Sequence, residues 1–313
     1  MGKKSLTPKI GAILRNRDFL LMLALALGLG AGGGARYMEK AVLPALAVVM
    51  TLATMGVPGK IFLSPRGLIS PLLVGLAMNY GILSGFLLGA SALWVCDPGL
   101  SRGFILMAAA PPAVAVIPFT VILKGNTPLS LGATIGCYLG ALLLMPLISV
   151  VGMGEAFGDP EKLVRIMLEL ILAPLVASRI LIKIKAVPRL EPYRGAVTNW
   201  SFFIVVYTIV GLNREFILQE PSALMMPALI ALMSTFGLGA AIEFLARLFR
   251  VNRATTTSLV LLGTHKNTGL SAGLSLTLFS EWTAVPSTIS TIFMLVYLVW
   301  LNLKHTRYAA MDT

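Results

Sequence analysis

The chain has 313 residues, of which 57% are hydrophobic and only 12% are charged, and its mean hydropathy is +0.87. A soluble protein carries roughly 25% charged residues, so this composition excludes an ordinary soluble domain and indicates an all-α membrane protein. The net charge of +12 would suggest nucleic acid in a soluble chain, but basic residues also collect in cytoplasmic loops, and we expect no nucleic-acid partner.

Ten apolar stretches are long enough to cross a hydrocarbon core about 30 Å thick. They lie near residues 19–35, 41–57, 68–93, 101–122, 129–153, 163–184, 195–212, 222–246, 254–279 and 283–303. Because no long hydrophilic segment separates them, we expect residues 1–313 to form one transmembrane domain. The basic stretch Met1–Arg17 could begin a signal peptide, but it lacks a small-residue cleavage context, and a retained first helix is expected.

The ten spans divide into two halves of five, at about 18–153 and 163–303. An odd number of spans per half makes the halves insert with opposite orientation, as an inverted repeat requires. Most of the 25 Lys and Arg residues fall in the loops on the side of the N-terminus. This bias places both termini in the cytoplasm and predicts a multi-pass protein of the lipid bilayer of the cytoplasmic (inner) membrane.

The fourth span is interrupted by prolines. Pro111 and Pro112 remove two backbone donors, and Pro118 removes a third. At membrane depth the freed carbonyl groups need partners, so such a stretch is packed in protein or lines a cavity. Pro112 and Ala113 are therefore candidate binding residues, although a simple proline kink explains this stretch equally well.

The ninth span contains five consecutive polar residues at mid-membrane. They are Thr264, His265, Lys266, Asn267 and Thr268, and a glycine stands at each end of the run. A lone histidine would more often be a core residue, but five polar side chains cannot all reach the headgroups, and burying them unpaired is costly. We therefore expect these five residues to bind substrate or to couple its transport.

Other polar residues of the spans give a weaker signal. Asn79 lies in the third span, and Ser130, Thr134 and Tyr138 share one helical face of the fifth. These side chains could line a polar interior, or they could simply pack between helices.

Two carboxylates have helical spacing to an arginine. Glu169 follows Arg165 by four residues, and Glu243 precedes Arg247 by four. Both pairs are predicted to be structural.

The sequence carries no sign of a catalytic centre. Cys96 and Cys137 give neither a disulfide framework nor the spacing of metal ligands. Paired carboxylates, or a nucleophile with its base, do not occur at suitable spacing. We expect no catalytic residue, no metal site and no cofactor.

With these residues in view, the chain resembles the bile acid:sodium symporter family of secondary transporters along its whole length. The likeness is clearest at Val48–Val57, at Ala110-Pro111 followed by Leu123–Ser130, and at Asn267–Ala272. The resemblance implies ten spans in two inverted repeats, a panel domain and a core domain, and fourth and ninth helices that cross at their breaks. It also implies transport of a small organic anion by alternating access.

The chain departs from the family at the positions that bind sodium. Family members that use sodium carry a Ser-Asn or similar polar pair after the fourth-helix break, and a Glu and a Gln around the ninth-helix break. Here Val116, Ile117, Leu262 and Lys266 stand at these positions. They cannot supply the several oxygen ligands of a hard cation, so we expect no bound sodium and Lys266 in its place. Polar family positions on the third and fifth helices are matched by Asn79, Ser130 and Thr134.

Lys266 could act in three ways. Burial favours the neutral amine, so the residue could take up and release a proton, with His265 as a second acceptor. It could stay charged and attract the anion of a uniporter or exchanger, or it could pair structurally.

Other functions stay open as well. They are a sodium-coupled symporter of the same family, an auxin-efflux or arsenite-like carrier, a channel, and an intramembrane enzyme. An arsenite carrier is disfavoured because neither cysteine lies at a helix break.

Overall fold

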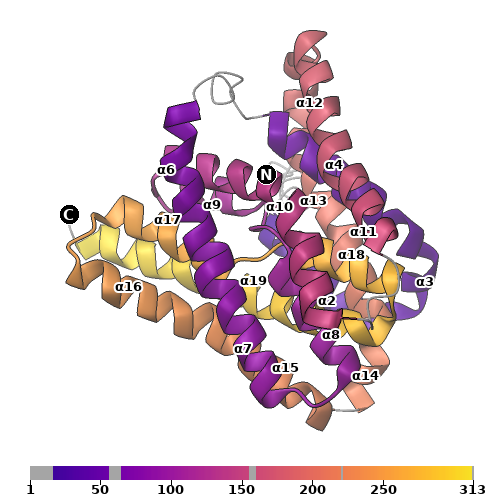
Figure 1. Ribbon diagram of the computed structural model, residues 1–313. Helices are drawn as coiled ribbons and strands as arrows, with labels where there is room; N and C mark the ends of the chain where they lie inside the picture. Colours follow the sequence, from indigo (N-terminus) through magenta and orange to yellow (C-terminus); the bar gives the residue numbers. More distant parts are fainter. Residues whose placement is uncertain (1–16, 56–64, 155–159, 220, 312–313) are drawn as a thin grey trace, which may run out of the picture.

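The computed structural model describes residues 17–55, 65–154, 160–219 and 221–311, which form helices joined by short turns (Figure 1). Within these ranges no β-strand forms, which confirms the all-α prediction. Predictions for the basic N-terminal segment before Arg17, for the end of the second span, and for part of the boundary between the two halves fall on residues outside the described ranges.

The first half of the chain contains the helices up to the middle of the sequence. They are α2 (Arg17–Ala31), α3 (Ala35–Met38), α4 (Val42–Met55), α6 (Pro65–Gly75), the π-helical segment η3 (Leu76–Ser84), α7 (Gly85–Trp94), α8 (Pro98–Ala109), α9 (Val116–Ile122) and α10 (Thr127–Met153). Two short 3₁₀ turns join α2, α3 and α4, and η3 joins α6 to α7 without interruption.

The rest of the chain also contains long and interrupted helices. Its elements are α11 (Pro160–Met167), η5 (Leu168–Leu172), α12 (Ala173–Lys183), α13 (Val187–Leu212), α14 (Arg214–Gln219), α15 (Pro221–Leu232), η6 (Met233–Gly237), α16 (Leu238–Leu248), α17 (Arg253–Thr264), α18 (Thr268–Leu278) and α19 (Glu281–Met311). Here η5 and η6 are again π-helical segments inside longer helices.

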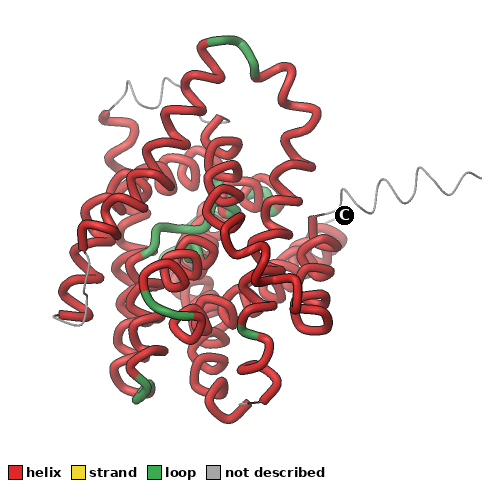
Figure 2. Tube along the Cα trace, turned by 90° about the vertical axis from the view of Figure 1, so that its right-hand side faces the viewer, coloured by secondary structure: helices red, strands yellow, loops and turns green. Residues whose placement is uncertain are grey.

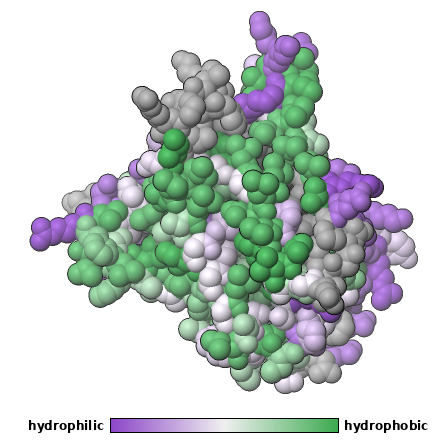
Figure 3. Space-filling view, viewed as in Figure 1, coloured by the Kyte–Doolittle hydropathy of each residue, from purple (hydrophilic) through white to green (hydrophobic). Residues whose placement is uncertain are grey.

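Six helical segments of the described chain are long and apolar enough to cross a membrane. They are Phe19–Met55, Ile69–Trp94, Thr127–Met153, Val187–Leu212, Ser222–Leu248 and Glu281–Lys304, the first of which takes in α2 to α4. Hydrophobic side chains cover much of the visible face of the molecule, as a surface in contact with lipid requires (Figure 3). The chain is a multi-pass membrane protein.

Two helices are interrupted in the middle of the molecule. Asp97 caps α8, which ends before Ala110, where the backbone is extended because the next residue is proline. The second half-helix, α9, begins at Val116, so Pro118 lies in its first turn, where a missing N–H is harmless. Figure 2 shows loop segments inside the bundle as well as at its ends.

The second interruption also follows a capped helix. Asn252 caps α17, whose 12 residues match the length of α8. The chain is extended at His265 (φ −121°, ψ 107°), and the side chain of Asn267 then caps α18.

The helices pack as two groups. In one group, α13 packs against α2 and α4, and α12 packs against α4. In the other, α10 packs against α6 and α8, while α19 packs against α8, α15 and α18.

Candidate functional site

The two helix breaks lie directly against each other. The Ala113 N–H donates to the His265 carbonyl at 3.1 Å, and the Asn267 N–H donates to the Pro111 carbonyl at 2.8 Å. These bonds make an isolated antiparallel bridge between Pro112 and Lys266. Backbone groups freed by the breaks thus satisfy one another, which membrane burial demands.

The side chain of Lys266 ends in a buried cage of neutral groups. Its Nζ donates to Asn79 Oδ1 and to the Ala110 carbonyl, both at 2.7 Å, and lies 4.3 Å from the centre of the Tyr80 ring. Lys266 is only 2% exposed. Two oxygen acceptors and one aromatic face together match the three N–H donors of an ammonium.

Asn79 connects this cage to the ninth-helix break. Its Nδ2 donates to the Leu262 carbonyl at 2.9 Å and to the His265 carbonyl at 3.3 Å, while its Oδ1 accepts from Lys266. The π-helical segment η3 carries both Asn79 and Tyr80. Such segments are frequent at functional sites, and this one supplies an oxygen and a ring face to the same ammonium.

No carboxylate within the described part of the chain forms an ion pair with Lys266. Its partners are an amide oxygen, a backbone carbonyl and an aromatic ring, and none of these carries a formal charge. A charged Lys266 therefore leaves the centre of the molecule with an uncompensated positive charge. That charge attracts an anion.

His265 is fixed by its neighbour in the sequence. The Thr264 hydroxyl donates to the Val260 carbonyl at 2.6 Å and lies 2.7 Å from His265 Nδ1. Since the single hydroxyl hydrogen goes to Val260, the Nδ1–H donates to the threonine oxygen. The remaining ring nitrogen, Nε2, is then the one that can accept a proton.

Asn267 and Thr268 organise the start of α18. Asn267 Oδ1 accepts from the Leu270 N–H at 3.0 Å, and its Nδ2 donates to the Tyr138 hydroxyl on α10 at 2.9 Å. The hydroxyl of Thr268 accepts from Thr291 on α19 at 2.8 Å. Both side chains are thus held by neighbouring helices.

Ser130 and Thr134 lie apart from the Lys266 cage. Ser130 Oγ accepts from Thr120 at 2.8 Å, which holds α9 against α10. The buried Thr134 hydroxyl has no hydrogen-bond partner among the described residues, and it lines a separate, smaller cavity together with Val114 and Tyr138. The structure therefore does not bring these two residues into contact with Lys266.

Two partners of the ninth-helix break were not singled out in the sequence. The ring of Tyr80 faces the ammonium, and Thr291 holds Thr268. Tyr80 follows Asn79 directly in the sequence, so its adjacency to a candidate was the available signal. The sequence gives no comparable sign for Thr291, which contacts Thr268 only because α19 packs on α18.

A cavity lies between α2, α4 and α13 on one side and the two breaks and α19 on the other. Its wall is mostly apolar. The polar residues of the wall are Lys266, Asn267, Thr268, Thr288 and Thr291. A ligand with an anionic end and an apolar body would place its charge toward Lys266.

One of the two predicted ion pairs is present. Arg247 lies 3.7 Å from Glu243, as the spacing predicted. The prediction for Arg165 and Glu169 was wrong, because Arg165 pairs with Glu161 at 3.5 Å, one helical turn earlier.

Comparison with known proteins gives two matches. The family model described as "Sodium Bile acid symporter family" matches residues 43–220, more than half of the chain. A Bacillus subtilis (strain 168) protein named "Uncharacterized sodium-dependent transporter YocS" is 27% identical over 242 residues. That alignment covers 76% of this chain and 72% of the Bacillus protein.

Proposed function

Because the chain belongs to the sodium bile acid symporter family and is a secondary transporter, not an enzyme, we propose that it carries a small organic anion by alternating access and that the Lys266 ammonium replaces a bound sodium ion. The observation that carries this proposal is the position of Nζ, 2.7 Å from two oxygen atoms and without a carboxylate partner among the described residues.

The environment of Lys266 resembles a cation site in which the ion is tethered. Asn79 and Ala110 direct oxygen atoms at Nζ, as ligands direct oxygen atoms at a metal ion. The side chains that would have to complete a sodium site are apolar. Val116 and Leu262 are buried, and their side chains have no oxygen atom. The name of the Bacillus relative calls that protein sodium-dependent. In this chain, the apolar residues at these positions favour a site in which the Lys266 ammonium supplies the positive charge.

The substrate would bind in the large cavity beside the breaks. Lys266, Asn267 and Thr268 offer a positive charge and polar groups at one place on its wall, and the remaining wall is mostly apolar. A ligand with an anionic group and an apolar body would match both the polar and the apolar part of this wall. A proton on Lys266 or on His265 Nε2 is the candidate coupling ion.

The helices support ten spans in two inverted halves. The halves would pair α8 and α9 with α17 and α18, each a 12-residue helix followed by a break. They would also pair η3 with η6, since each π-helical segment lies inside the span that precedes the broken one. The panel would then contain α2, α4, α11, α12 and α13, and the core the other spans.

Transport in proteoliposomes tests the proposal. A thermal-shift screen of carboxylates, including a bile acid, would first identify a ligand for the purified full-length protein. Saturable uptake and counterflow of that ligand distinguish a carrier from a channel. We expect the uptake rate to stay unchanged when external sodium is replaced by potassium, and a strict requirement for sodium would contradict the role given to Lys266.

The variant Lys266→Gln separates charge from hydrogen bonding at this position. Glutamine keeps a donor but removes the positive charge, and a hydrogen bond to a charged group is worth about 1.5–3 kcal/mol, so we expect uptake to fall roughly ten-fold or more. The matched control is Lys185→Gln, because Lys185 is exposed. Uptake by Lys266→Gln at the control rate, with the same dependence on pH, would remove Lys266 from the mechanism.

A further inference from the structure

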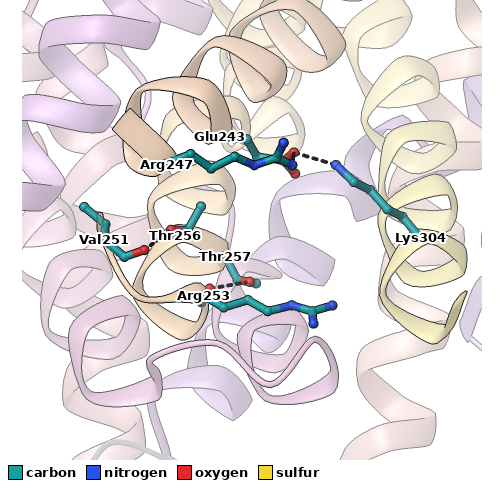
Figure 4. A network of polar contacts seen from close by, with 7 residues as sticks. All are labelled: Glu243, Arg247, Val251, Arg253, Thr256, Thr257 and Lys304. Atoms are coloured by element: carbon teal, nitrogen blue, oxygen red, sulfur yellow. Dashed lines mark hydrogen bonds and ion pairs between the residues drawn. The ribbon is translucent and has the colours of Figure 1, made fainter. Parts of the chain in front are cut away.

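A second large cavity lies away from the helix breaks, and its wall is charged. It lies between the end of α16, the start of α17 and the residues of α19 around Leu301. Its charged lining residues are Glu243, Arg247, Arg253 and Lys304 (Figure 4). The 12 residues of α17, about 18 Å of helix, run from this cavity to the break at Thr264. The cavity is therefore distinct from the one beside Lys266.

The wall carries more positive than negative charge. Glu243 Oε2 lies 2.5 Å from Lys304 Nζ and 3.7 Å from a guanidinium nitrogen of Arg247. One carboxylate is thus shared by two cations, and Arg253 adds a third cation to the wall. Figure 4 shows Glu243 and Arg247 on one side facing Lys304 on the other, with Arg253 below them.

The hydroxyl groups in this wall do not compete for an anion. Thr256 donates to the Asn252 carbonyl at 3.0 Å, and Thr257 donates to the Arg253 carbonyl at 3.0 Å. Each hydroxyl hydrogen is therefore committed to the backbone of α17 or its cap. The other polar donors of the wall belong to the arginine and lysine side chains.

The cavity lies where membrane spans end. Arg247 is next to the last residue of the span Ser222–Leu248, and Lys304 is the last residue of the span Glu281–Lys304. Beside them, Phe244 and Leu303 are 66% and 58% exposed, so α16 and α19 present apolar faces to the surroundings. A charged cavity next to a lipid-facing surface, at the end of two spans, is at the depth of lipid headgroups.

We propose that this cavity binds the headgroup of an anionic phospholipid. Its phosphate is held by Arg247, Arg253 and Lys304, and its acyl chains lie on the exposed apolar faces of α16 and α19. The planar guanidinium fork matches two phosphate oxygen atoms, and basic pockets between membrane helices suit such headgroups. Glu243 limits the positive charge of the wall. A soluble phosphate would use the same donors without the apolar contact.

Lipid binding to the full-length protein tests this assignment. Purified protein in detergent is titrated with phosphatidylglycerol, with phosphatidylcholine and with inorganic phosphate, and bound ligand is measured by native mass spectrometry. We expect phosphatidylglycerol to bind more tightly than phosphatidylcholine. The variant Arg253→Gln should weaken its binding about five-fold, since one basic residue near a membrane surface contributes about 1 kcal/mol. The control Arg250→Gln removes the same charge close by but outside the cavity wall, and its binding should be unchanged.

A second variant keeps the test independent of folding defects. Glu243→Gln removes the only carboxylate among the lining residues described, so phosphatidylglycerol should bind more tightly even if the protein becomes less stable. An equal loss of binding in Arg253→Gln and Arg250→Gln would overturn the proposal, because it would indicate a diffuse surface effect. Binding of inorganic phosphate with no preference among lipids would also overturn it and assign the cavity to a soluble anion.

Discussion

At the scale of single residues, the protein places one lysine where charge is most costly and surrounds it with dipoles. Lys266 contacts the Asn79 amide, the Ala110 carbonyl and the Tyr80 ring. A buried charge without a charged partner is expensive, and the neutral acceptors offset only part of that expense. An incoming anion would supply the negative charge that the described protein partners lack. The buried charge of Lys266, which lowers the stability of the folded state, would thus favour substrate binding.

The contact between Lys266 and Asn79 should be measurable as a coupling energy. Asn79→Leu leaves the ammonium with one fewer acceptor and the carbonyl groups of Leu262 and His265 without their amide donor. Lys266→Met removes the ammonium that needs the acceptor. A hydrogen bond to a charged group contributes about 1.5–3 kcal/mol. The sum of the losses in free energy of unfolding of the two single variants should therefore exceed the loss in the double variant by this amount.

Equilibrium unfolding of the wild type, both single variants and the double variant would give this coupling energy. Additive effects of the two substitutions, within about 0.5 kcal/mol, would mean that Lys266 does not depend on Asn79 in the folded state.

At the scale of elements, both halves of the ninth span begin with a capping asparagine, and the two asparagines differ in burial. Asn252 caps α17 at an exposed position, whereas Asn267 caps α18 inside the protein and also bonds to Tyr138. Each asparagine accepts from the backbone N–H three residues later, although the backbone at Asn252 (ψ 153°) and at Asn267 (ψ 77°) differs. Only the buried cap connects a break to a neighbouring helix.

Replacing each cap by alanine separates these two roles. Loss of the cap alone costs about 1 kcal/mol, so Asn252→Ala should reduce the free energy of unfolding by this amount. Asn267→Ala also orphans the buried Tyr138 hydroxyl, which adds about 1–3 kcal/mol. Thermal or chemical unfolding of both variants measures the difference. Adding Tyr138→Phe to Asn267→Ala should recover most of the extra loss, and equal effects of the two alanine variants would contradict the role of Tyr138.

The element scale also shows where sequence patterns suffice. The family resemblance predicted a break in the ninth helix, and the structure breaks within the polar run from Thr264 to Thr268, where the extended backbone at His265 lets the two breaks bond to each other. Asn79 and Lys266 were both predicted as candidates, but the contact between them was not. The contact depends on the π-helical segment and on packing between residues 187 positions apart, which no local pattern encodes.

Long-range packing also explains the sequence predictions that lacked detail or were wrong. Ser130 and Thr134 share a buried face with Tyr138, as the helical period predicted, but only Tyr138 reaches the break at Asn267. Arg165 had two carboxylates at helical spacing, Glu161 before it and Glu169 after it. The π-helical segment η5 begins at Leu168 and changes the helical register before Glu169, so the pair with Glu161 forms.

At the scale of the whole molecule, the large cavity separates the proposed panel from the proposed core. Its panel wall comes from α2, α4 and α13, and its core wall comes from the two breaks and α19. Near the breaks, α18 of the core packs against α4 of the panel. Alternating access by rocking of one body on the other requires this contact to slide.

Fixing the contact between α4 and α18 should therefore stop transport. A Cβ atom built on Gly273 would lie 3.1 Å from Leu43 Cδ2, so side chains at these two positions are in contact. In a background without Cys96 and Cys137, the pair Leu43→Cys and Gly273→Cys should transport when reduced and lose most of its uptake when oxidised. Reductant should restore the uptake, and each single-cysteine variant should be insensitive to oxidation. Full uptake by protein that is shown to be cross-linked would exclude relative motion of α4 and α18 as a step of the cycle, because a covalent bond between two rigid bodies cannot coexist with their sliding.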